Sequence, residues 1–95
     1  NLWVPNRGSV SVTVVRAATG QVLATLTGNG LDEPISAAFD GERILVTSVR
    51  GVSLWKAADL TPLISFFITG TSFGACSDGV NFWFTLSSNN RLVRF

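Results

Sequence analysis

Residues 12–23 read VTVVRAATGQVL, and residues 52–63 read VSLWKAADLTPL. The two stretches align without a gap, from Val12 on Val52 onward, with hydrophobic residues on hydrophobic residues and Arg16 on Lys56. A period of about 40 residues, built from short strands and turns, is typical of a supersecondary unit that buries its apolar faces by stacking on its neighbours. The repeat therefore indicates the fold class more firmly than it indicates an activity.

Other parts of the unit recur too. The pair Asp40-Gly41 returns as Asp78-Gly79, and Trp3 is followed by Trp83 two periods later. Helical periodicity is absent, and Gly, Asn, Asp, Pro and Ser clusters punctuate the chain, as in an antiparallel meander. The pattern predicts ten strands, at residues 2–5, 10–16, 22–27, 35–39, 43–48, 52–56, 63–69, 73–77, 81–87 and 91–95.

The strands fall into units of four, A to D in chain order. Residues 1–30 hold strands B, C and D, residues 31–71 hold all four, and residues 72–95 hold A, B and C. We therefore predict an all-β fold, a β-propeller fragment of about two and a half four-stranded antiparallel blades within one propeller domain. The chain begins inside a strand pattern, so further blades are expected from the same polypeptide or, as the second choice, from other copies.

Side-chain size supports the same prediction. Both A strands carry three small residues, SAA at residues 36–38 and GAC at residues 74–76. The bulky residues, among them Leu54, Phe66 and Phe84, belong to strands B to D. A propeller requires this gradient, because its innermost strands converge on a central axis where space is short.

These residues resemble a known repeat. FDG at residues 39–41, the apolar triplet ILV at residues 44–46 and the strand and turn VSLWKAADLT at residues 52–61 look like the bacterial YVTN-type, surface-layer-like β-propeller repeat. GVNFWFT at residues 79–85 is also similar to the repeat of virginiamycin B lyase propellers. The resemblance covers almost the whole chain and implies a propeller at an extracellular, cell-surface or periplasmic location.

The amino-acid composition restricts the kinds of partner that can be expected. Hydrophobic residues make up 46% of the chain and charged residues only 14%, against about 25% charged in an average soluble domain, so much of the surface is expected to be covered. Residues 63–68 form the longest apolar stretch, far short of the roughly 20 residues that span a bilayer, so no membrane insertion is expected. The net charge of +1 arises from scattered residues, so no nucleic-acid partner is expected.

The residues that most enzymes use are scarce here. The chain has no His, no Tyr and one cysteine, Cys76, so we predict no catalytic residue, no metal ligand and no cofactor in this segment. Asp40 and Asp78 are each followed by Gly and are interpreted as hairpin residues rather than metal ligands. The alternatives are a lyase or lactonase-like propeller enzyme whose catalytic blades lie outside the segment, and a purely structural repeat.

Turns of the B-to-C and D-to-A types emerge on one face of a propeller. We predict that the chain is a non-catalytic scaffold that binds a protein or glycan partner through these turns, although solvated turns explain the same residues without a ligand. Asn29 and Ser72 are expected to join this surface. The candidate binding residues are Asn6, Arg7, Asp32, Glu33, Arg50, Asn89 and Asn90.

The three tryptophans admit a ligand-stacking role or a packing role. Trp3 and Trp83 occupy the same place in the B strand, which favours packing between blades. Trp55 ends a C strand, where Val15 stands in the other copy, and is expected to be partly exposed.

Overall fold

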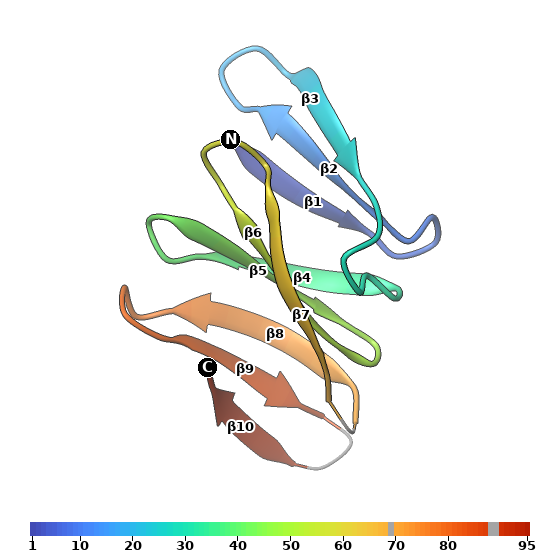
Figure 1. Ribbon diagram of the computed structural model, residues 1–95, viewed down its shortest axis with the longest axis vertical. Helices are drawn as coiled ribbons and strands as arrows, with labels where there is room; N and C mark the ends of the chain where they lie inside the picture. Colours follow the sequence, from blue (N-terminus) through green and yellow to red (C-terminus); the bar gives the residue numbers. More distant parts are fainter. Residues whose placement is uncertain (69, 88–89) are drawn as a thin grey trace.

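A computed structural model describes residues 1–68, 70–87 and 90–95. Antiparallel β-strands form its regular structure, and no helix occurs in these residues (Figure 1). The ten strands are β1 (Leu2–Asn6), β2 (Ser11–Arg16), β3 (Gln21–Leu26), β4 (Pro34–Phe39), β5 (Arg43–Ser48), β6 (Gly51–Lys56), β7 (Pro62–Phe67), β8 (Ser72–Ser77), β9 (Phe82–Leu86) and β10 (Arg91–Arg94).

The all-β prediction is confirmed, and each predicted strand is present with bounds shifted by no more than two residues. The largest shift concerns the seventh strand, expected at residues 63–69 and found as β7. Its expected end, Thr69, lies outside the described residues. The agreement has a simple cause, because turn residues separate every pair of apolar runs.

Hairpins join the strands into three sheets. The first sheet has the order β1-β2-β3, the middle sheet β4-β5-β6-β7, and the third sheet β10-β9-β8. Every paired strand is thus next to its partner in the sequence. Gly41 and Gly79 make two of the hairpins possible, because their φ angles of 104° and 91° lie in a region that only glycine adopts without strain.

The sheets repeat one another in their irregularities as well. The register of β2 and β3 shifts between Val14 and Val15, and that of β6 and β7 shifts at the equivalent place, between Leu54 and Trp55. The β4–β5 and β8–β9 pairs both shift at their starts, after Pro34 and after Ser72. Bulges are specific local features of a backbone, so their recurrence supports the equivalence of the sheets beyond sequence likeness.

The sheets stack face to face, and strands β5 and β6 of the middle sheet are covered on both sides, whereas its edge strand β7 is exposed along its length (Figure 1). One core cluster lies between the first and middle sheets and includes Val12, Ile44, Val46 and Trp55. The other lies between the middle and third sheets and includes Leu45, Val52, Leu54, Phe82, Phe84 and Leu86. Successive side chains of a strand point to opposite faces, so β5 contributes to both clusters and its residues after Arg43 are all buried.

Strands β4 and β8, which carry the small residues, lie against each other. Ala38 and Ala75 pack at the edge of the second cluster, and their small size permits this close approach. A hydrogen bond fixes the distance between the sheets, since the buried hydroxyl of Thr47 donates to the carbonyl oxygen of Phe73 at 2.6 Å. Small residues therefore lie where two sheets meet most closely.

Candidate functional site

The connections β1–β2, β3–β4 and β5–β6 all emerge at the same end of the sheets, on the right in Figure 1. We call this the Arg50 end. The hairpins β2–β3, β4–β5 and β8–β9 emerge at the opposite end, the first at the top of Figure 1 and the other two on the left. The sequence predicted binding residues on the first group of turns, so the Arg50 end is the candidate binding surface.

Two of the predicted residues contact each other at the Arg50 end. Nε of Arg50 lies 3.5 Å from Oδ2 of Asp32, and these side chains are 76% and 42% exposed. The backbone supports the contact, because the amide of Val49 donates to the carbonyl oxygen of Asp32 at 2.9 Å. The pair therefore joins the β3–β4 connection, which links the first and middle sheets, to the β5–β6 turn of the middle sheet. A surface pair of this kind contributes only about 0–1 kcal/mol to stability.

The other predicted residues differ in their accessibility. Arg7, Glu33 and Asn90 are exposed, and Glu33 and Asn90 adopt left-handed backbone conformations with φ of 52°. Asn89 lies outside the described residues. Asn6 is half-buried and its amide donates to the hydroxyls of Ser11 at 3.2 Å and Thr13 at 2.7 Å, so it organises the first hairpin.

Two further residues were expected on this surface, and for Ser72 that expectation was wrong. Ser72 is fully buried, with its hydroxyl oxygen 2.7 Å from the carbonyl oxygen of Ser48 and 2.9 Å from that of Gly51. Asn29 donates its side-chain amide to the carbonyl oxygen of Leu54 at 2.9 Å. Both residues fasten a sheet connection to the neighbouring hairpin, because buried backbone carbonyls need donors. Polarity alone does not distinguish such side chains from solvated ones.

The repeated aspartates close turns at the opposite end. Oδ1 of Asp78 accepts from the amides of Val80 at 2.8 Å and Asn81 at 2.7 Å, while Oδ2 accepts from Nε1 of Trp83 at 2.8 Å. The hydrogen bond from the Asn81 amide, followed by those from Trp83 and Val80, lowers the pKa of Asp78 from 3.8 to about 2. Each donor favours the charged carboxylate, so Asp78 stabilises its hairpin as an anion.

Asp40 has the same arrangement in the middle sheet. Its Oδ1 accepts from the amides of Glu42 at 2.9 Å and Arg43 at 2.6 Å, and its Oδ2 lies 2.9 Å from Nη2 of Arg43. Burial alone would raise the pKa of Asp40, but these hydrogen bonds and the guanidinium outweigh burial and lower the pKa below 3.8. In the described part of the chain, no three His, Cys, Asp or Glu side chains are grouped to hold a metal ion.

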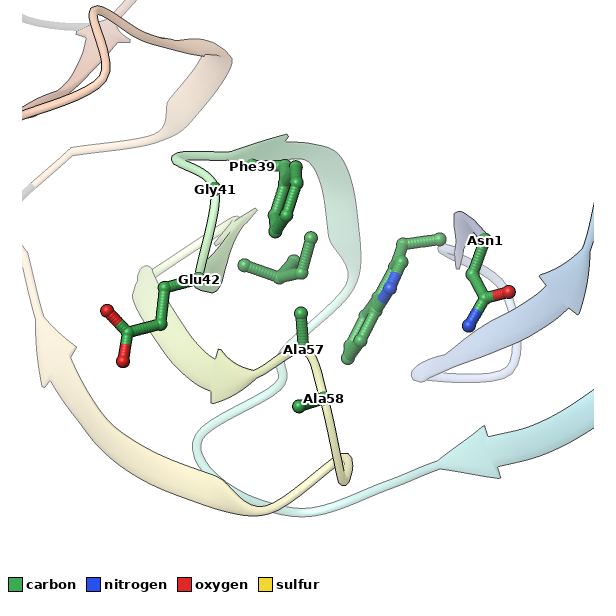
Figure 2. A pocket seen from close by; sticks show the side chains of 8 residues that line it. Asn1, Phe39, Gly41, Glu42, Ala57 and Ala58 are labelled. Atoms are coloured by element: carbon green, nitrogen blue, oxygen red, sulfur yellow. The ribbon is translucent and has the colours of Figure 1, made fainter.

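A cavity of about 350 Å³ opens between the first and middle sheets at the opposite end. In Figure 2, Asn1 lies on one side of it, and the carboxylate of Glu42 points away from Phe39 and Ala57. An open cavity with aromatic walls can accept an aromatic or sugar ring. Its lining consists of Asn1, Trp3, Phe39, Gly41, Glu42, Ile44, Ala57 and Ala58.

The cavity reflects a difference between repeats. In the middle sheet Arg43 occupies the position that Asn1 has in the first, and its guanidinium lies 5.4 Å from the ring centroid of Phe82 in the third sheet. Asn1 is too short to fill the corresponding space above Ile44. This cavity was not predicted from the sequence. The signal would have been the missing counterpart of Arg43 in the first repeat.

The tryptophans follow the sheet geometry only in part. Trp3 packs against the cluster between the first and middle sheets. Trp83 holds the same position in the third sheet but lies on its outer face, with Leu92 and Cys76 beside it. The expectation for Trp55 was wrong, because its side chain is only 2% exposed between the first and middle sheets. Trp55 is buried where the other copy has Val15 because the middle sheet is covered on both faces.

Comparison with protein-family models and with curated proteins finds no match to this chain. No helix in the described residues is long and apolar enough to cross a membrane.

Proposed function

We propose that this chain is a non-catalytic interaction scaffold of the β-propeller type, in which the three sheets are blades and the turns at the Arg50 end bind a protein or glycan partner. One observation carries the proposal. The exposed Arg50 and Asp32 side chains meet where the β3–β4 connection passes the β5–β6 turn, and there they offer a cation and a carboxylate to the same ligand.

The location of these charges favours binding over a role in folding. An exposed ion pair adds little stability, whereas a guanidinium forms strong, directional hydrogen bonds with carboxylates and other oxygen groups. Arg7 and Glu33 extend the charged surface over two neighbouring turns and are exposed. Residues on turns that a rigid sheet supports often serve recognition.

The propeller assignment and the location rest on the repeat. Bulges recur at matching positions, and the sequence resembles the YVTN-type repeat of bacterial surface proteins. We accordingly propose an extracellular, cell-surface or periplasmic setting. Fold and repeat alone do not specify a ligand, so the binding residues require a direct test.

The test compares charge reversals at the two ends of the sheets. The double variant Arg7→Glu/Arg50→Glu should lose binding to a glycan array or to proteins of a bacterial envelope extract, with an unchanged melting temperature. Arg16→Glu is the matched control, because Arg16 is exposed on the β2–β3 side. Binding that survives the double variant but is lost in Phe39→Ala would place the ligand in the cavity and contradict the proposal.

A further inference from the structure

The outer faces of the first and third sheets are apolar and uncovered. Leu92 is 65% exposed on the third sheet, and Leu2 and Val22 are 54% and 59% exposed on the first. The total accessible surface of 5276 Å² equals the roughly 5,300 Å² expected of a compact protein of this mass. The total exposed area is therefore ordinary, and it is the apolar character of the two outer faces that indicates a partner.

The outer face of the third sheet repeats the face by which the middle sheet binds the third. Leu45 pairs with Ala38 and Leu54, and Trp83 pairs in the same way with Cys76 and Arg94. Thr47 pairs with Val52 in the middle sheet, and Thr85 pairs with Leu92 at the equivalent place in the third sheet. In the middle sheet, the face with Leu45 and Val52 packs against Phe82 and Phe84.

The outer face of the first sheet repeats the receiving side of the same interface. Leu2 pairs with Val15 as Ile44 pairs with Trp55, and Val4 corresponds to Val46 and Phe84. In the middle sheet this face packs on the first sheet, and in the third sheet it packs on the middle one. Each open face thus matches one side of an interface that already exists between two sheets of the chain. A further sheet could pack on it in the same way.

We infer that a second copy of this chain docks head to tail, with its first sheet on the third sheet of the first copy. Trp83 and Leu92 then contact Leu2 and Val4 of the other copy, as Leu45 and Val52 contact Phe82 and Phe84 within the chain. This contact is heterologous, so it builds rings or open chains according to the angle between copies.

Charge favours this arrangement over a symmetric pairing of two third sheets. Arg94 is exposed and pairs with Trp83, so it lies on the same outer face. A symmetric dimer through this face would bring two copies of Arg94 into an apolar interface, where like charges repel. The outer face of the first sheet carries the uncharged residues Leu2, Val4, Thr13 and Val15, so it receives Arg94 without a second cation.

Two variants that each block one face test the inference. Leu92→Arg alters the third sheet and Val4→Arg alters the first, and both positions are exposed, at 65% and 43%. Light scattering should give the wild type a mass that is a multiple of 10.1 kDa, and each variant alone 10.1 kDa. A mixture of the two variants should form a complex of two chains and nothing larger, because one intact pair of faces remains.

Controls separate this outcome from loss of folding and from other assemblies. Val80→Arg changes an apolar residue that is 77% exposed in the β8–β9 turn and should keep the wild-type mass. If circular dichroism shows that Val4→Arg is unfolded, Leu2→Arg tests the same face. A monomeric wild type at all concentrations would overturn the inference, as would a dimer that Leu92→Arg abolishes and Val4→Arg leaves intact.

Discussion

Leu60 adopts the left-handed backbone conformation that Gly20 adopts at the equivalent turn of the first sheet, with φ of 64° and 74°. The two turns are otherwise alike. The amide of Gly20 donates to the carbonyl oxygen of Arg16 at 2.8 Å, and the amide of Leu60 donates to that of Lys56 at 2.9 Å. The middle sheet therefore forms the same turn as the first sheet, but with a leucine, whose side chain disfavours the left-handed backbone conformation.

Exchange of the two residue types should change stability in opposite directions. Leu60→Gly should remove strain and raise the free energy of unfolding by up to about 1 kcal/mol, while Gly20→Leu should lower it by about 1–2 kcal/mol. In a domain of this size, 1 kcal/mol corresponds to a shift of about 4–8 °C in melting temperature. Thermal denaturation followed by circular dichroism measures both, and equal effects of the same sign would contradict this account.

Gly51→Ala should destabilise the middle sheet strongly. A Cβ atom at position 51 would overlap the backbone carbonyl oxygen of Phe66, on the strand that pairs with β6. Backbone atoms of a paired strand cannot move aside as a flexible side chain can, so we expect a loss of about 2–3 kcal/mol. Urea denaturation measures the change.

Gly8→Ala is the matched control for this substitution. No heavy atom lies within 4 Å of a Cβ at Gly8, and its φ is not in the left-handed region. The change should leave the free energy of unfolding within about 0.5 kcal/mol of the wild-type value. Equal losses in the two variants would show that the approach of β7 to Gly51 is not the cause.

The charge of Asp78 should make stability depend on pH in a defined window. The pKa is lowered in the folded protein, so the contribution of Asp78 is complete above the unfolded value of 3.8 and disappears as the pH falls to about 2. Asp78→Asn keeps an acceptor for the turn amides but carries no charge. The difference in melting temperature between wild type and Asp78→Asn should therefore shrink over this window.

Melting curves recorded between pH 2 and pH 6 test this dependence. Asp59→Asn offers a comparison, because hydrogen bonds from the Thr61 side chain and amide also lower the pKa of Asp59 below 3.8. A constant difference between wild type and Asp78→Asn across the range would contradict the proposed anionic turn.

The strands could be predicted from sequence because the information that specifies them is local. Asp40-Gly41 and Asp78-Gly79 mark hairpins by their own conformational preferences, and alternation of Ile44, Leu45 and Val46 between two cores gives a continuous apolar run that still reads as a strand. No distant contact is needed to recognise either feature.

The candidate site depends on contacts that the sequence does not display. Ser72 and Asn29 look like turn residues, yet their side chains donate hydrogen bonds to backbone carbonyl groups of the neighbouring hairpin. The contact between Arg50 and Asp32 depends on how the β3–β4 connection runs beside the β5–β6 turn. Trp55 is buried because the neighbouring sheet, and not its own strand, decides its exposure.

The pairing of each strand with its immediate neighbour in sequence bears on how the protein forms during synthesis. A growing polypeptide can complete the first sheet before the residues of the second leave the ribosome, since no strand waits for a distant partner. Local pairing of this kind lowers contact order and speeds folding. The late step is then the docking of preformed sheets, during which apolar faces are exposed and a chaperone would have the greatest effect.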